Sequence, residues 1–262
     1  TTLFRSDHYD EVVKDATCRL LTYALNGNAD FMGDDIHYAS NHDFVGIEFS
    51  IHGMLDGRVR VGMPGKFNAD NALAALAVCT LALSGGSGVL DDHTKQAILG
   101  SLVKVRVDGR MEIAHVSKKC SVIVDYAHNA VSMESLLTTL RDYHPKRLVC
   151  VFGCGGNRAR DRRYSMGEIG GKMADLCIIT ADNPRFEKNE DIIKDIEVGL
   201  AKTDGTYLVI PDRREAIFYA IRNAEEGDMI AIIGKGHEDY QEIEGVKHHF
   251  LDREVVEEAV KG

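Results

Sequence analysis

The chain has 262 residues, 44% of them hydrophobic, which is enough for one large domain or two modest ones with packed cores. Asp and Glu number 41 and Lys and Arg number 31, so the formal net charge is −10. This acidic balance argues against a general nucleic-acid binder or a protein of anionic membranes, because both need a basic surface. All apolar runs are shorter than the roughly 18 residues that a membrane-spanning helix needs.

The chain begins with Thr1 rather than Met, and charged residues interrupt its opening stretch at Arg5, Asp7 and Asp10. A signal peptide has an uninterrupted apolar core, so we expect none here. We expect the chain to be part of a longer, cytoplasmic protein.

The cysteines form no CxxC pair, and neither they nor the histidines have the spacing of zinc ligands. We therefore expect reduced, buried thiols and no metal site. Cys154 differs from the others because it lies in a glycine-rich loop. The six positions are Cys18, Cys79, Cys120, Cys150, Cys154 and Cys177.

The first hundred residues predict short strands followed by two helices. Apolar and polar residues alternate in runs between residues 34 and 63, which is typical of a small antiparallel meander. An apolar stretch from Ala72 to Leu83 predicts a helix capped by Asn68 or Asp70, and Asp91-Asp92 begins a second helix that runs through Val103. The predicted strands are 36–38, 45–51 and 59–61.

From about Gly109 the pattern changes to strands that alternate with helices. The strands are short, continuous apolar runs, as expected for strands that are covered on both faces. Such alternation predicts an α/β, Rossmann-like, mostly parallel and doubly wound sheet, with a domain border near residue 108. The strands are 121–124, 148–152, 176–180, 207–210 and 229–233, and the helices begin near Ser132, Tyr164, Asp191 and Asp212.

Charged and polar residues follow each of these strands. Ligands of open parallel sheets bind beyond the carboxyl ends of the strands, so we expect these loops to form one site. Arginines would hold carboxylates and a glutamate would hold an ammonium group, which suits a zwitterionic small molecule. The loops are Asp125–Asn129, Gly153–Arg158, Asp182–Arg185, Asp212–Arg214 and Gly234–Glu238.

Several of these residues leave two interpretations open. The glycines from Gly153 could cradle an anion, but the loop is neither GxGxxG nor GxxxxGK[ST], and the arginines after it could be a solvated helix surface. His128 could contact a nucleotide or transfer a proton, or it could organise its own turn. The loop from Asp182 to Arg185 could be a plain surface turn. His248-His249 is expected in an exposed strand or loop.

The motifs together resemble the Mur ligases of peptidoglycan synthesis. Their order and spacing are similar to the branch that adds meso-diaminopimelate as the third peptide residue. The family has an N-terminal domain for the UDP-sugar, a central P-loop ATPase domain that forms an acyl phosphate, and a C-terminal domain that brings the amino acid. The motifs are the five segments Gly109–Glu112, Asp125–Asn129, Gly153–Arg158, Asp182–Arg185 and Gly234–Glu238, with Gly65–Ala72 upstream.

The resemblance implies that residues 1–108 are the rear part of the central ATPase domain and that residues 109–262 are a complete C-terminal domain. The P-loop, most Mg²⁺ ligands and the carbamylated lysine of the family would lie outside this chain. By position, the ATP contacts would be Asn68, Asn71, Arg110, Asp125 and His128. The meso-diaminopimelate contacts would be Arg158, Asp182, Asn183, Pro184, Arg185, Gly234 and Glu238. The family usually has Thr where this chain has Asn129.

The resemblance also implies the partners. ATP, Mg²⁺, meso-diaminopimelate and UDP-N-acetylmuramoyl-L-alanyl-D-glutamate would be used by a monomeric protein in the bacterial cytoplasm. Arg185 favours diaminopimelate over lysine, because lysine would leave the guanidinium unpaired. The alternatives are a lysine-adding Mur ligase and a ligase like folylpolyglutamate synthase. Without a P-loop, we expect the chain alone neither to hydrolyse ATP nor to ligate.

Overall fold

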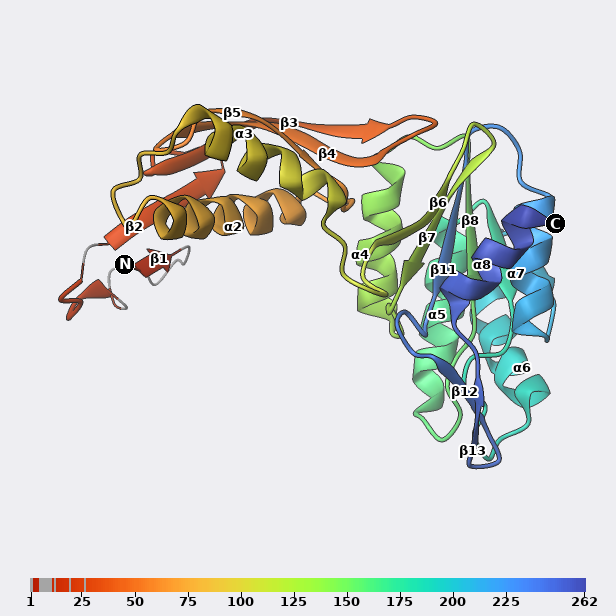
Figure 1. The fold of residues 1–262 in the computed structure, drawn as a ribbon. Coiled ribbons are helices and arrows are strands. Elements are labelled where there is room, and N and C mark those ends of the chain that lie inside the picture. Colours follow the sequence, from red (N-terminus) through yellow and green to blue (C-terminus); the bar gives the residue numbers. More distant parts are fainter. Residues whose placement is uncertain (1, 5–10, 12, 19, 26) are drawn as a thin grey trace. The chain divides into compact units, whose positions relative to one another are not determined.

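The computed structural model describes residues 2–4, 11, 13–18, 20–25 and 27–262. The expectation about Arg5, Asp7 and Asp10 lies outside these residues. The chain divides into two compact units, of which the first holds the residues up to Ala39 and Val45–Val105 and the second holds Ser40–Phe44 and Arg106–Gly262 (Figure 1). The domain ranges 1–108 and 109–262 stay a prediction.

Among the described residues, the first unit contains a five-stranded mixed sheet. Strands β4 and β5 pair antiparallel, which agrees with the predicted meander, whereas β1 pairs with β2, and β2 with β3, in parallel. The two parallel strands, β1 and β2, were not predicted from sequence. In sheet order the strands are β1 (Thr2–Phe4), β2 (Leu20–Leu25), β3 (Phe31–Ser40), β4 (Val45–Gly53) and β5 (Gly57–Val61).

Two helices pack on this sheet through a core of aliphatic and aromatic side chains. Helix α2 (Phe67–Leu83) begins after Lys66, so Asn68 and Asp70 lie inside its first turn and the predicted cap is wrong. Helix α3 (Asp92–Ser101) has Asp91 as its cap, which accepts a hydrogen bond from Thr94 N, and a 3₁₀ turn (Leu102–Lys104) follows. The core includes Ile47, Phe49, Val59, Leu73, Leu76 and Leu99.

The second unit confirms the predicted mostly parallel sheet. All neighbouring strands are parallel except the edge pair β6 and β7. In sheet order the strands are β10 (Tyr207–Val209), β9 (Leu176–Ile179), β8 (Arg147–Phe152), β11 (Asp228–Ile233), β7 (Cys120–Asp125) and β6 (Glu112–Val116). The helices are α4 (Ala130–Arg141), α5 (Arg160–Met173), α6 (Asn189–Leu200), α7 (Arg213–Arg222) and α8 (Asp252–Lys261).

Helices cover both faces of this sheet, as a doubly wound fold requires (Figure 1). One face of the strands, with Val122, Val151 and Ile232, packs against α7 and α8. Residues of the other face approach α4 and α5, because Gly170 lies against Cys177, Phe152 and Met133. Covering on both faces explains why these strands read as continuous apolar runs in the sequence.

Strand β6, helix α8, and a hairpin of β12 (Tyr240–Ile243) and β13 (Val246–His249) were not predicted in the second unit. Strand β13 is exposed and β12 is half-buried except at Ile243, so no continuous apolar run marks the hairpin in the sequence. His248 and His249 lie in β13 and are exposed, as expected. Helix α5 also begins four residues before the predicted start near Tyr164. Cys18 and Cys79 are exposed, contrary to the expectation of burial, whereas the other four cysteines, Cys154 included, are buried.

No helix in the described part of the chain is long and apolar enough to span a bilayer.

Candidate functional site

The carboxyl ends of β7, β8, β9 and β11 surround a cavity of about 250 Å³. Four of the five predicted loops contribute to its wall, because parallel strands end at the same edge of the sheet. Of the predicted residues, His128, Arg158, Asp182, Asn183, Arg185, Gly234 and Glu238 line it, together with Tyr126, Gly153, Cys154, Gly155 and Arg162.

The glycines of the second loop let it pack against the loop after β9. A Cβ at Gly153 would lie 2.2 Å from the carbonyl oxygen of Thr180, and one at Gly156 would lie 1.9 Å from that of Pro184. No side chain fits at such distances. Packing between the loops therefore accounts for these two glycines, without an anion.

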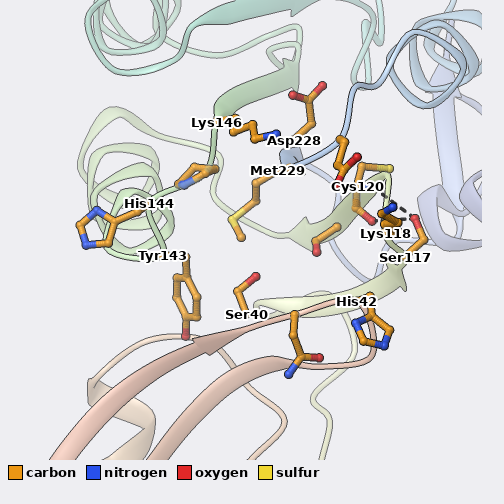
Figure 2. Close-up of a pocket in the computed structure, with 15 residues that line it drawn as sticks. Ser40, His42, Ser117, Lys118, Cys120, Tyr143, His144, Lys146, Asp228 and Met229 are labelled. Carbon is orange, nitrogen blue, oxygen red and sulfur yellow. Dashed lines mark hydrogen bonds between the residues drawn. The ribbon is translucent and has the colours of Figure 1, made fainter.

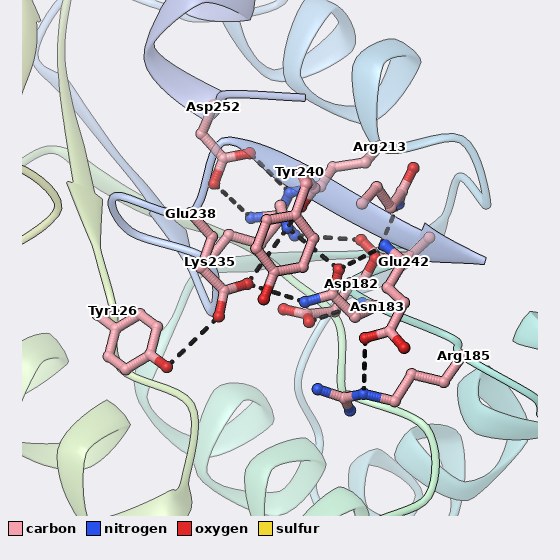
Figure 3. A network of polar contacts seen from close by, with 12 residues as sticks. Tyr126, Asp182, Asn183, Arg185, Arg213, Lys235, Glu238, Tyr240, Glu242 and Asp252 are labelled. Atoms are coloured by element: carbon pink, nitrogen blue, oxygen red, sulfur yellow. Dashed lines mark hydrogen bonds and ion pairs between the residues drawn. The ribbon is translucent and has the colours of Figure 1, made fainter. Parts of the chain in front are cut away.

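Lys235 is fully buried under the cavity and orders the residues around it (Figure 3). Its Nζ donates to the carbonyl of Tyr240, to Asn183 Oδ1 at 3.3 Å and to Glu238 Oε2 at 3.4 Å. Burial lowers the pKa of Lys235, while the charge of Asp182 acts in the opposite direction. An ammonium group has three N–H donors, so these three acceptors satisfy it completely.

The amide of Asn183 has one orientation that fits its partners. Its Oδ1 accepts from Lys235 Nζ and from the backbone N–H of Glu242 at 2.9 Å, and its Nδ2 donates to Glu238 Oε2 at 2.8 Å. A flipped amide would place donors against donors. Asn183 is 2% exposed, so this arrangement is a fixed part of the protein.

Glu238 presents one carboxylate oxygen to the cavity. Its Oε2 is held by Asn183 and Lys235, whereas its Oε1 accepts only a 3.4 Å contact from the hydroxyl of Tyr126 among the contacts that the structure describes. Burial and the charge of Glu238 raise the pKa of Tyr126. The carboxylate of Asp182 lies on the same wall and accepts from Asn183 N at 2.7 Å. The wall can therefore accept hydrogen bonds from an ammonium group.

A ligand carboxylate needs cations, and three arginines that line the cavity can supply them: Arg158, Arg162 and Arg185. The other two arginines of the run after the glycine-rich loop are ion-paired: Arg163 is buried against Asp195 at 2.9 Å, and Arg160 lies 3.2 Å from the same carboxylate. The run thus divides into arginines that line the cavity and arginines that join α5 to α6.

Tyr126 is also the centre of a cluster of flat side chains. The guanidinium of Arg110 lies 4.8 Å from its ring centroid, and the rings of His128 and His237 lie at 4.8 and 5.4 Å. The Nδ1 of His128 lies 2.9 Å from the carbonyl oxygen of Tyr126. His128 therefore makes the local turn contact that the sequence left open and lines the cavity as well.

Asp125 is buried and holds the backbone together. Its carboxylate accepts from the N–H groups of Met111 and Ala127, each at 2.7 Å. Burial raises the pKa of Asp125, and these two hydrogen bonds oppose the rise. The structure thus gives this predicted ATP contact partners within the protein and does not place it on the cavity wall.

Asn68 and Asn71 lie in the other unit, at the beginning of α2. Asn68 is buried and donates to the carbonyl of Pro64 at 2.7 Å, whereas Asn71 is exposed and donates to Asn68 Oδ1 at 3.2 Å. Asn68 thus positions Asn71 and anchors the helix start.

Two family models match the chain. A model of the Mur ligase glutamate ligase domain matches residues 109–236, and a model of the Mur ligase middle domain matches residues 3–79. The chain belongs to the Mur ligase family. The first model covers the five motif segments from Gly109 onward, except His237 and Glu238, the last two residues of the final motif.

Relatives within the Mur ligase family are similar over nearly the whole chain. A UDP-N-acetylmuramoyl-L-alanyl-D-glutamate–2,6-diaminopimelate ligase from Clostridium acetobutylicum is 40% identical over 95% of the chain and 49% of its own length. The enzyme of that name from Aquifex aeolicus is 42% identical over 91% of the chain and 45% of its own length. The chain therefore spans about half the length of these relatives.

Solved structures agree with the fold. A structure of a 2,6-diaminopimelate-adding ligase of this family has a TM-score of 0.74 at 34% identity and covers 97% of this chain and 51% of the other. A folylpolyglutamate synthase from Thermotoga maritima has a TM-score of 0.59 at 21% identity, over 85% of this chain and 47% of the other, which supports a shared fold alone.

Sequence reasoning about this Mur ligase chain missed the roles of Tyr126, Lys235, Glu242 and Arg213. Tyr126 and Lys235 lie within the motifs Asp125–Asn129 and Gly234–Glu238, so the motifs already indicated that these two residues lie near the site. Arg213 was expected at the ligand edge, but it is fully buried and pairs with Asp252 at 2.8 and 2.7 Å. Its other hydrogen bonds reach the carbonyl of Ala181, two residues after the end of β9, and the carbonyl of Ile233, the last residue of β11.

A second hollow lies at the amino ends of the strands (Figure 2). The start of β7 at Cys120 and the start of β11 at Asp228 contribute to it, together with His144. It contains no motif residue of the Mur ligases. Within the described residues, no group of three His, Cys, Asp or Glu side chains could hold a metal ion.

Proposed function

We propose that this chain is the rear part of an ATP-dependent ligase that adds meso-diaminopimelate to UDP-N-acetylmuramoyl-L-alanyl-D-glutamate in the bacterial cytoplasm. Residues 1–108 would complete the central ATPase domain and residues 109–262 would bring the amino acid. The similarity to relatives named as 2,6-diaminopimelate ligases supports the substrate.

The observation that carries this proposal is the mixed charge of one small cavity. Arg158 and Arg185 can receive carboxylates, and Glu238 and Asp182 can receive an ammonium group. Diaminopimelate carries both kinds of group at both ends, whereas lysine lacks the second carboxylate. A site that pairs a guanidinium with this carboxylate can reject the analogue without it by about 10⁴ to 10⁵.

The nucleotide would be held mainly outside the cavity. Asn71 and Arg110 are exposed, so they remain candidates for contact with ATP, and Asn68 and Asp125 would act by holding the backbone around them. ATP supplies the phosphate that activates the substrate carboxylate when it is bound.

The test uses the longer enzyme that carries this chain, with ligation measured for meso-diaminopimelate and for L-lysine. We expect a clear preference for diaminopimelate, and we expect Arg185→Ala to raise the KM for diaminopimelate far more than the KM for ATP. Arg214→Ala is the control, since Arg214 is a half-exposed arginine that pairs with Glu258. A preference for lysine would overturn the substrate assignment. The 262 residues alone should show no ligation.

A further inference from the structure

The β12–β13 hairpin holds the backbone of Arg185. The N–H of Arg185 donates to the carbonyl of Glu242 at 3.0 Å, and the N–H of Glu244 donates to the carbonyl of Arg185 at 2.7 Å. Arg185 has a φ of 53°, a left-handed conformation that is uncommon outside glycine. These two backbone hydrogen bonds keep Arg185 in this conformation, so its side chain extends from a fixed backbone position.

The guanidinium of Arg185 has part of its donor set occupied by the protein (Figure 3). Its Nε donates to Glu242 Oε2 at 3.2 Å, and its Nη1 donates to the carbonyl of Gly156 at 2.8 Å. A guanidinium binds a carboxylate through two adjacent N–H groups. Because Glu242 occupies Nε, a ligand carboxylate meets the two terminal nitrogens, of which Nη2 has no partner among the described residues.

Glu242 is itself fixed in place. Its backbone N–H donates to Asn183 Oδ1 at 2.9 Å, and its side chain is 22% exposed, next to an Arg185 side chain that is 21% exposed. Ion pairs that are partly shielded from solvent are screened less by salt. Through Asn183, the pair is also connected to Glu238 on the wall that would receive an ammonium group.

We propose that Glu242 is a positioning residue that sets the direction in which Arg185 meets a ligand carboxylate, and so determines selectivity for an amino acid with a second carboxylate. This inference rests on the proposed function. Without Glu242, the flexible Arg185 side chain loses rotamer entropy when a ligand orders it, and this loss weakens binding. With Glu242, the side chain is already ordered in the folded protein, so the entropy is lost before the ligand binds.

The experiment measures kcat and KM for meso-diaminopimelate and L-lysine in the longer enzyme. Loss of an orienting, charge-assisted hydrogen bond is expected to raise the diaminopimelate KM about tenfold in Glu242→Ala. The variant Glu242→Gln keeps an acceptor, and neutral hydrogen bonds are roughly half as strong, so we expect a rise of about threefold. We expect kcat and the lysine KM to stay unchanged in both. Glu244→Asn is the control, because it removes a charge from the same hairpin and Asn tolerates the φ of 50° there.

The outcomes separate this inference from the proposed function. If both Glu242 variants lower the diaminopimelate KM, Glu242 competes with the ligand and the inference is wrong. The inference is also wrong if Glu242→Ala and Glu244→Asn have the same KM for diaminopimelate. It is wrong as well if kcat falls equally for both amino acids in Glu242→Gln and in Glu242→Ala, because this result indicates damage to the fold. If the wild-type enzyme does not use diaminopimelate, the proposed function fails, and this inference fails with it.

Discussion

The buried pair of Arg213 and Asp252 allows a quantitative prediction about how the cavity edge is held. Both side chains are 0% exposed, and Arg213 cannot lose its proton inside a protein. Asp252→Ala leaves this charge buried without its partner, which should cost about 3–5 kcal/mol of unfolding free energy.

The double variant Arg213→Met with Asp252→Leu tests what else the pair does. Replacing a buried ion pair by apolar residues is often neutral or stabilising. Here Arg213 also donates to the carbonyls of Ala181 at 3.2 Å and Ile233 at 3.0 Å. Each buried carbonyl left without a donor costs about 1–3 kcal/mol, so the double variant should remain about 2–6 kcal/mol less stable than the wild type.

Native-state amide hydrogen exchange in β11 is the assay, because it reports on the second unit alone and the chain has two units. The control is the exposed pair of Arg214 and Glu258, whose removal should cost less than about 1 kcal/mol. A double variant as stable as the wild type would show that the two carbonyl contacts contribute nothing, and would refute this reasoning.

Three further predictions follow from single groups. Tyr126→Phe should raise the diaminopimelate KM of the longer enzyme only about two- to threefold, because the 3.4 Å contact with Glu238 is long for a hydroxyl donor; a much larger rise would mean that the hydroxyl contacts the ligand. Burial raises the pKa of Cys154 to about 12, so iodoacetamide at pH 8 should alkylate the exposed Cys79 and leave Cys154 intact, as read by mass spectrometry; early labelling of Cys154 would show that its thiol is accessible and ionised, contrary to this prediction. The raised pKa of Asp125 means that the folded state binds its proton more tightly than the unfolded state. The contribution of Asp125 to the free energy of unfolding should therefore fall as pH rises from 3.8 through its folded pKa. In Asp125→Asn, the unfolding free energy measured by hydrogen exchange should lack this fall with pH.

The sequence predicted the elements whose residues repeat a simple pattern. Strands such as 148–152 are covered on both faces, so their apolar runs stand out, and the loops after them follow from the topology. The hairpin from Tyr240 to His249 shows no such pattern, because half of it faces solvent. It was missed, and with it the residue that pairs with Arg185.

Within the site, the sequence indicated which residues meet but not which way each one turns. Arg158 and Arg163 lie five positions apart in one run, yet one lines the cavity and the other is buried against Asp195. Arg213 and Arg214 are neighbours, and only the first is buried. Side-chain direction depends on which helix or loop packs opposite, and no local pattern encodes it.

The net charge of −10 shows why the orientation of individual arginine side chains matters more for binding a carboxylate than the overall composition does. An acidic protein does not attract a ligand carboxylate by its overall field, so the cavity needs guanidinium groups that are aimed and kept from neighbouring acids. Arg163 is unsuited, because Asp195 and Glu187 already bind it. Arg185 also lines the cavity and is paired with an acid, but Glu242 holds it by Nε, so that among the described contacts Nη1 meets only the carbonyl of Gly156 and Nη2 has no partner. The same kind of ion pair thus withdraws one arginine from binding and prepares the other for it. The difference is which edge of the guanidinium the carboxylate occupies.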